Sequence, residues 1–214
     1  MGQKVNPISF RLGARLDYTW QSRWFVDRRN YKKMLLEDFN IREFLMRKLR
    51  PAGILRVEIE RSINKLKVIL FVTRPGLVIG RGGSGLEELK KLICQKTALP
   101  NPEKNVSLGV MGVTDREVGL EPRLLATQIA DGLLKRMPWR RLVERAMNQA
   151  MEAGARGVKI VLGGRIGGAE ISRREKFFRG TIPLSTLKAK IDFVSLPVLT
   201  RSGYIGVKVW ICRQ

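Results

Sequence analysis

The sequence contains no histidine, the residue that most often serves proteins as a general base or a metal ligand. Its two cysteines, Cys94 and Cys212, lie far apart and lack any C-x-x-C spacing. Two such thiols cannot form a zinc site alone, so we expect no metal and a reducing compartment. No apolar run reaches the roughly 18 residues that cross a bilayer, and no secretory signal is visible. We therefore expect a cytoplasmic protein with no membrane partner.

Acidic residues are few beside the basic ones. The 214 residues include 19 Asp and Glu against 41 Lys and Arg, a formal net charge of +22. Residues 1–30, 31–113 and 114–214 are each net positive, so no single tail accounts for the excess. A charge this large implies a polyanionic partner, and its spread fits nucleic acid around the protein better than one face on a membrane.

The apolar pattern predicts a first compact domain over residues 31–113, preceded by a basic and aromatic arm over residues 1–30. A helix is expected first, at residues 31–50, followed by two strands, at 54–61 and 66–73, that form an antiparallel hairpin. A glycine loop, a second long helix and a third strand at 106–113 complete the domain. The apolar stripe of the first helix is expected to consist of Leu35, Leu36, Phe39, Phe44, Leu45 and Leu49.

The glycine loop lies in the stretch GLVIGRGGSGLEEL, residues 76–89, and has two interpretations. As G-x-G-x-x-G it is a dinucleotide-binding fingerprint, but that motif should leave a parallel strand directly, and here Pro75 and Gly76 intervene. As G-x-x-G it is the loop with which KH domains clamp about four nucleotides. Ser84 and Glu87 have the spacing of a capping box for the helix that follows. The sequence favours the KH interpretation over a dinucleotide site or a tight turn without a ligand, with RNA bound by Gly80, Arg81, Gly82 and Gly83.

Residues 114–214 predict a second domain, in which two helices pack on an antiparallel sheet. The helices are expected at 122–136 and 139–153, separated by Pro138. The fold class is therefore α+β with two domains. The strands of the sheet are expected at 158–162, 169–178, 187–194 and 204–211.

Several motifs resemble one protein family. The order helix-strand-strand-helix-loop-helix-strand is that of a type II KH domain (α-β-β-α-α-β), and PGLVIGRGG is similar to its loop. Nearly the whole chain resembles the bacterial-type S-three family of small-subunit ribosomal proteins. The segments that carry this likeness are MGQKVNP, RLG, GGRIGGAEISR, PLSTLKAKIDF and GYIGVKVWI, in that order.

The resemblance implies a structural protein of the small-subunit head, with no enzymatic activity, no cofactor and no small-molecule substrate. Its expected partners are 16S-type ribosomal RNA, messenger RNA and the neighbouring ribosomal proteins of the 30S head. The family lines the channel by which messenger RNA enters the ribosome with two arginines and, three residues later, a lysine that assists unwinding. Arg140 and Arg141 match the arginines, Glu144 replaces the lysine, and Arg145 follows it. The plainer interpretation of Arg140 and Arg141 is a solvated helix face.

Other basic residues are candidate contacts to ribosomal RNA. Arg165 lies in a second glycine cluster, where we expect a bent strand connection that contacts a phosphate. Arg173, Arg174 and Arg179 surround Phe177 and Phe178, which indicates either an RNA-facing patch with stacking rings or a strand that buries one phenylalanine. Lys4 and Arg11 are the candidates in the arm. Two rival functions remain: a dinucleotide enzyme, and a KH regulator that acts away from the ribosome.

Overall fold

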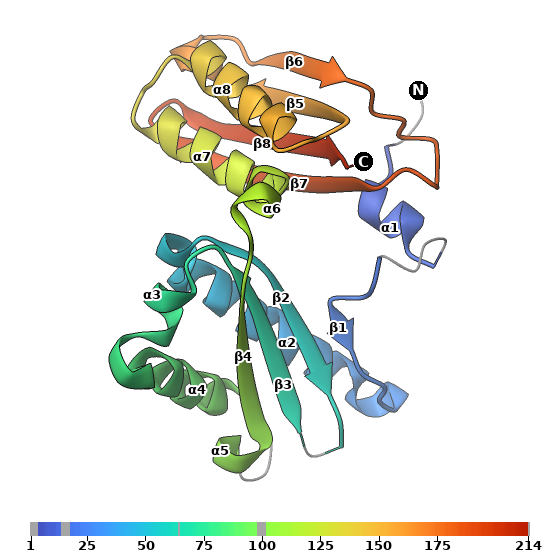
Figure 1. Ribbon diagram of the computed structural model, residues 1–214, viewed down its shortest axis with the longest axis vertical. Coiled ribbons are helices and arrows are strands. Elements are labelled where there is room, and N and C mark those ends of the chain that lie inside the picture. The colour runs from blue at the N-terminus through green and yellow to red at the C-terminus, as the bar shows by residue number, and fades with distance from the viewer. Residues whose placement is uncertain (1–3, 14–17, 64, 98–101, 214) are drawn as a thin grey trace. The chain divides into compact units, whose positions relative to one another are not determined.

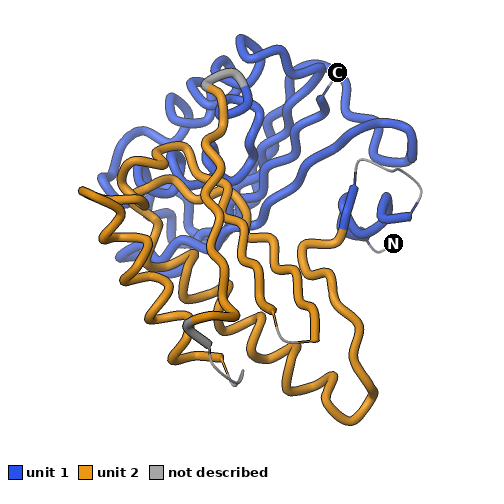
Figure 2. The backbone as a smooth tube through the Cα atoms, turned by 60° about the horizontal axis from the view of Figure 1, so that its bottom comes forward, with its two compact units in different colours: residues 1–19, 115–214 blue, residues 20–114 orange. Residues whose placement is uncertain are grey.

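A computed structural model of the chain describes residues 4–13, 18–63, 65–97 and 102–213. The chain forms two compact units (Figure 2). We name the unit Trp20–Thr114 the KH unit, after the domain that its sequence resembles, and the C-terminal unit combines Met1–Thr19 with Asp115–Gln214. No helix in the described part of the chain is both long and apolar enough to span a membrane.

The KH unit has the α-β-β-α-α-β order that the sequence predicts (Figure 1). Its sheet has the order β1-β2-β3-β4, with β2 antiparallel to β3 and β4 parallel to β3. The core lies between this sheet and the two long helices, where Ile41, Leu45 and Ile93 meet strand residues such as Val68. The elements are β1 (Ser22–Arg23), α2 (Arg28–Lys48), η1 (Arg50–Ala52), β2 (Ile54–Arg61), β3 (Leu66–Val72), α3 (Pro75–Ile79), η2 (Arg81–Gly83), α4 (Ser84–Lys96), α5 (Pro102–Asn105) and β4 (Val106–Gly112).

The first half of α2 differs from the predicted apolar stripe. Leu45 and Leu49 are buried, but Leu35, Leu36 and Phe39 are each about half exposed. Asp38 faces inward instead and is 1% exposed. It accepts hydrogen bonds from Trp24 Nε1 at 2.8 Å and from Arg61 Nε at 2.7 Å. A buried carboxylate is costly unless it is hydrogen-bonded, and Trp24 and Arg61 provide those hydrogen bonds. The inward face of the first half of α2 is therefore polar at Asp38, where the sequence pattern predicted only apolar residues.

The C-terminal unit confirms the prediction of two helices on an antiparallel sheet (Figure 1). The sheet has the order β6-β5-β8-β7, and helices α7 and α8 bury Leu125, Ile129, Val143 and Met147 against one of its faces. The elements are α1 (Pro7–Arg11), α6 (Asp115–Gly119), α7 (Pro122–Leu134), α8 (Trp139–Glu152), β5 (Gly157–Gly164), η3 (Ile166–Gly168), β6 (Arg173–Gly180), β7 (Ile191–Thr200) and β8 (Gly203–Cys212).

Two strands of this sheet lie later than predicted. The stretch expected at 169–178 is β6, at Arg173–Gly180, because the chain first turns through η3. The stretch expected at 187–194 is β7, at Ile191–Thr200. The carbonyls of Leu184, Thr186 and Ala189, before β7, accept hydrogen bonds from the side chain of Arg11 instead of from a neighbouring strand.

The predicted arm is divided between the two units. Helix α1 belongs to the C-terminal unit, whereas Ser22 and Arg23 pair with β2 in the KH unit. Contacts place the breaks between residues 19 and 20 and between 114 and 115. The limits 1–30, 31–113 and 114–214 thus stay predictions. The arm does not form a unit of its own by contacts, because α1 packs in the C-terminal unit and Ser22 and Arg23 pair with β2.

Candidate nucleic-acid interface

The glycine loop connects α3 to α4 through a backbone that only glycine adopts readily. Gly80, Gly82 and Gly83 have φ values of 72°, 61° and 85°. A Cβ on Gly80 would lie 2.9 Å from the main-chain nitrogen of Gly85, so Gly80 is also required by packing. A Cβ on Gly82 or Gly83 would meet nothing within 4 Å. The outer side of the loop is therefore bare main chain that a sugar-phosphate backbone can approach closely.

The capping box predicted at this loop is wrong. Gly83, in the left-handed conformation, is the N-cap of α4, and Ser84 is the first helical residue. The Ser84 hydroxyl donates a hydrogen bond to the Arg81 carbonyl at 3.0 Å, inside the loop. In a capping box it would instead accept one from the main-chain N–H of Glu87. With Ser84 as N-cap the helix would begin at Gly85, but it begins at Ser84. Gly83 can take the N-cap position because glycine adopts the left-handed conformation readily.

Arg81 is exposed at the N-terminal end of α4 and has no ion-pair partner within the described ranges. Unpaired N–H groups and the helix dipole favour an anion at this position, and the guanidinium adds a fixed positive charge. Helix α3 separates β3 from the loop, so the strand does not run directly into it as a dinucleotide fingerprint requires. The arrangement suits a phosphate backbone at the loop.

The structure separates the basic residues of α8 into two groups. Arg141 and Arg145 line an open groove between α7 and α8, with Glu144 between them. Arg140 lies instead over the ring of Trp139, with its guanidinium carbon 5.0 Å from the ring centroid. Arg140 and Arg141 thus point to different sides of the helix, as neighbours about 100° apart must.

Trp139 is the residue that sequence reasoning missed here. Arg173 of β6 lies 5.7 Å from its ring centroid, and the ring of Phe177 packs against it at 5.7 Å. The tryptophan therefore brings Arg140 and Arg173 to one place, although 33 positions separate them in the chain. The start of a helix directly after Pro138 was the only signal that could have marked it.

The structure agrees with the interpretation in which the strand buries one phenylalanine, and the RNA-facing patch stays a prediction. Phe177 packs toward the helices, whereas Phe178 is 77% exposed on the other face of the sheet. Arg174 shares the face of Phe178, because side chains alternate along β6. Arg179 is tied to Asn148 of α8 by a hydrogen bond.

Arg165 holds the second glycine cluster in its bent form. Its Nε donates to the Ala169 carbonyl at 2.7 Å and its Nη1 to the Ser202 carbonyl at 3.4 Å. The side chain remains exposed. The bend that the sequence predicts is present, and the hydrogen bonds of Arg165 stabilise it.

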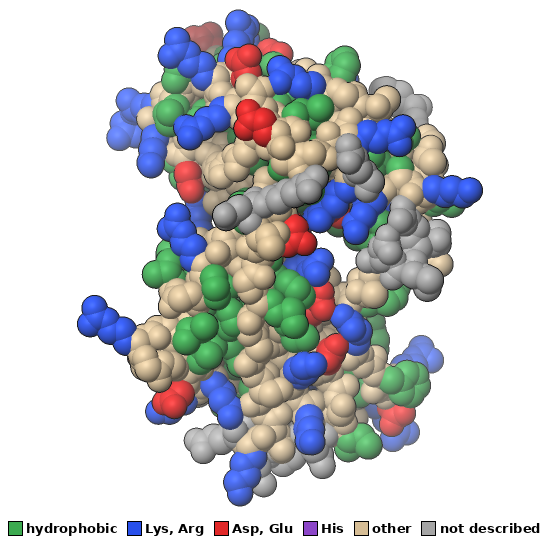
Figure 3. Space-filling view, in the orientation of Figure 1, with side chains coloured by type: hydrophobic (Ala, Val, Ile, Leu, Met, Phe, Trp, Pro, Cys, Tyr) green, Lys and Arg blue, Asp and Glu red, His purple; other side chains and the backbone are tan. Residues whose placement is uncertain are grey.

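Basic side chains are spread over both units rather than gathered in one place (Figure 3). Two protein-family models match the chain: "KH domain" over residues 40–117 and "Ribosomal protein S3, C-terminal domain" over residues 129–211. Small ribosomal subunit protein uS3 of Desulforamulus reducens is 44% identical over 213 residues, which cover 100% of this chain and 92% of that protein. The chain belongs to the uS3 family. The uS3 proteins of Clostridioides difficile and Myxococcus xanthus are each 43% identical, over 214 and 213 residues, and cover all of this chain and 76% and 92% of theirs. Membership in the uS3 family confirms the predicted family and fold class and the prediction that the chain is not an enzyme.

One candidate contact of this uS3 chain must be corrected. Arg11 is 0% exposed, so it does not reach an RNA from this position. Its Nε donates to the Ala189 carbonyl at 2.8 Å and its Nη1 to the Pro7 carbonyl at 3.0 Å. Its Nη2 donates to three more carbonyls, those of Pro183, Leu184 and Thr186, at 3.3, 3.0 and 2.9 Å. Arg11 therefore fastens α1 to the segment before β7, a role that a count of charges cannot distinguish from RNA binding.

Proposed function

We propose that the chain is a structural constituent of the small-subunit head that binds 16S-type ribosomal RNA, on ribosomes in the cytoplasm and beside other proteins of the head. The observation that carries the RNA-binding proposal is the loop at the start of α4. Gly82 and Gly83 leave its main chain open, and Arg81 stands beside them without an ion-pair partner in the described structure. A phosphate backbone is the ligand that needs both close approach to main-chain N–H groups and a fixed positive charge.

The experiment is a salt series of the binding of the full chain to a fragment of small-subunit ribosomal RNA. The logarithm of affinity is expected to fall linearly with the logarithm of salt concentration, by roughly 0.7 per phosphate neutralised on single strands. Affinity that does not change with salt contradicts the proposal. Saturable binding of a nicotinamide or flavin dinucleotide in calorimetry would contradict the assignment of the glycine loop to RNA.

We further propose that α8 helps to line the channel by which messenger RNA enters. Arg141 and Arg145 are exposed along the groove between α7 and α8, where a passing strand could be contacted, and Arg140 stands with Arg173 at the start of the helix. Glu144 lies in the same groove, whose lining holds as many carboxylates as cations: Asp131, Glu144 and Glu152 beside Lys135, Arg141 and Arg145. The contribution of this helix to unwinding is accordingly weaker here than with a lysine at that position.

Ribosomes carrying Glu144→Lys are expected to pass a stable messenger hairpin faster than ribosomes with the natural chain, by a few fold. The substitution replaces repulsion of the messenger phosphates with attraction at the same place. The measurement is the translation rate through the hairpin relative to an unstructured messenger.

Glu43→Lys provides the matched control, because it makes the same charge change at an exposed position of α2, outside the groove between α7 and α8. It is expected to change the rate little. Equal acceleration by both variants would indicate a general effect of charge. No acceleration by Glu144→Lys would mean that this face of α8 contacts solvent rather than messenger RNA.

A further inference from the structure

The C-terminal sheet has one face covered by α7 and α8 and a second face that these helices leave free. Ile182, Leu184 and Ala189 cover part of that second face, around Val161 and Trp210. Ile160, Phe177 and Val209 pair side by side and face the helices. Their neighbours along each strand therefore face the other way. We call this second surface the open sheet face; its strand residues include Lys159 and Val161 of β5, Arg174, Lys176 and Phe178 of β6, Phe193 and Ser195 of β7, and Tyr204, Lys208 and Trp210 of β8.

Positive charge on the open sheet face has no acidic counterpart among the described strand residues. Lys159, Arg174, Lys176 and Lys208 belong to it, and no aspartate or glutamate occupies a strand position that points to this side. Burial and repulsion by Lys4, Lys176 and Arg174 lower the pKa of Lys159. Lys4, Arg174 and Lys176 are thus close enough to Lys159 to repel it, and a polyanion would relieve that repulsion.

The sheet of the KH unit shows that this imbalance is not a general property of the chain. Its face away from the helices also carries basic residues, but Arg23 pairs with Glu58 at 2.7 Å and with Glu60 at 3.1 Å. Arg56 pairs with Glu58 at 3.2 Å, and Lys67 with Glu60 at 3.2 Å. Each of these three cations therefore has a carboxylate partner on its own face, whereas the cations of the open sheet face have none at the described strand positions.

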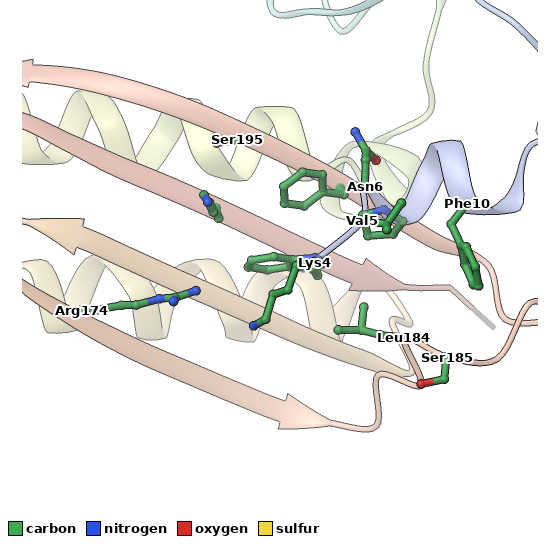
Figure 4. A pocket seen from close by; sticks show the side chains of 12 residues that line it. Lys4, Val5, Asn6, Phe10, Arg174, Leu184, Ser185 and Ser195 are labelled. Carbon is green, nitrogen blue, oxygen red and sulfur yellow. The ribbon is translucent and has the colours of Figure 1, made fainter. Parts of the chain in front are cut away.

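A hollow of about 620 Å³ lies on the open sheet face beside the N-terminal segment. Lys4 and Arg174 reach over the same stretch of sheet, from that segment and from β6 (Figure 4). The floor is aromatic, because the ring of Phe193 packs on the mostly buried Trp210 at 4.8 Å. Such a volume lies in the range of small-ligand sites, roughly 300–1,000 Å³. Polar side chains stand beside the rings; they are Asn6, Ser185 and Ser195.

We propose that the open sheet face binds a segment of single-stranded RNA, with its phosphates on Lys159, Arg174, Lys176 and Lys208 and one base in the hollow against Phe193. Cations along a backbone path next to stacking rings are the combination that single-stranded nucleic acids require. Phe178 and Tyr204, which are 77% and 68% exposed, offer further rings at the two ends of the face. The site rests on the proposed RNA-binding function and adds to the KH loop a second surface, in the other unit.

The test uses the full chain and a short fluorescent oligouridine as the probe. It is carried out in the background Gly82→Asp with Gly83→Asp, so that binding at the KH loop does not hide binding elsewhere. Adding Lys159→Gln, Lys176→Gln and Lys208→Gln removes three cations of the open sheet face. Three lost phosphate contacts are expected to weaken binding about 100-fold at about 0.1 M salt and to lower the salt slope by about 2.

The charge-matched control adds Lys32→Gln, Lys33→Gln and Lys48→Gln in the same background. These lysines are exposed on α2 of the KH unit, so the control should weaken binding far less. Equal loss in both triple variants would mean that net charge alone attracts the probe, which overturns the proposal. Unchanged affinity without the three lysines of the face, or no binding by the background protein, overturns it too.

A crosslinking experiment identifies where the base lies. Oligouridine that contains 4-thiouridine is expected to crosslink to peptides of β7 or β8, and Phe193→Leu should lower the yield several-fold. Crosslinks confined to other segments contradict the base site. If a polyglutamate peptide binds the face and oligouridine does not, the occupant is an acidic protein segment and the RNA proposal fails. Ribosomal RNA binding by the natural chain is measured separately, so the proposed function can stand when the second surface fails.

Discussion

Arg11→Met is expected to lower the free energy of unfolding of the C-terminal unit by about 3 kcal/mol, because it removes five hydrogen bonds that a buried guanidinium donates to carbonyls. The carbonyls of Pro183 and Thr186 keep main-chain donors. Methionine has a similar length but donates no hydrogen bond. Hydrogen exchange of β7 and β8 peptides in increasing urea reports on this unit by itself. Their protection should be lost at a lower urea concentration than in the natural chain.

Arg165→Met is the matched control for Arg11→Met. Arg165 also donates to main-chain carbonyls, but it is exposed, so water replaces the lost bonds. The expected loss is about 0.5 kcal/mol or less. If Arg11→Met costs no more than Arg165→Met, the hydrogen bonds of Arg11 to these carbonyls do not stabilise the unit.

The second large effect is expected at the KH loop. Gly82→Asp combined with Gly83→Asp should weaken binding to a ribosomal RNA fragment about 100-fold at about 0.1 M salt. Two carboxylates at this position repel the backbone of the clamped nucleotides, and the loss of about three phosphate contacts accounts for that factor. Equilibrium binding of the full chain over a salt series measures both the affinity and the slope.

Gly82→Ala with Gly83→Ala separates the effect of charge from that of backbone strain. Both positions have positive φ, where alanine is strained at least as much as aspartate. A methyl group there meets no other atom within 4 Å. The alanine variant should therefore bind RNA better than the aspartate variant. Equal losses would mean that loop conformation, and not repulsion of a phosphate, explains the result.

The sequence predicts those parts of the fold that local pattern controls. Alternating residues over β2 and β3, and the helix that follows the glycines, place the KH order correctly because strand and helix periods are local properties. The N-cap at Ser84 fails because Gly83 competes for the same role one residue earlier. The late start of β7 also escapes prediction, since it depends on Arg11, more than 170 positions away.

Which charged residues are buried is the feature that the sequence composition predicts least well. Asp38 and Arg61 form a buried pair, Nη2 to Oδ1 at 2.6 Å, and the apolar spacing of α2 gives no sign of it. Arg11 counts toward the net charge of +22 although no solvent reaches it. Conversely, Lys159, Lys176 and Lys208 look ordinary in the sequence, and only the register of three strands brings them to one face.

The most direct test of the central claim is sedimentation of the full chain in a ribosome gradient from cells that produce it. The account predicts that the chain runs with small subunits and whole ribosomes and that little remains at the top of the gradient. A chain found mainly at the top, under conditions in which other proteins of the small-subunit head run with the subunit, would contradict the ribosomal assignment and support a KH regulator that acts alone.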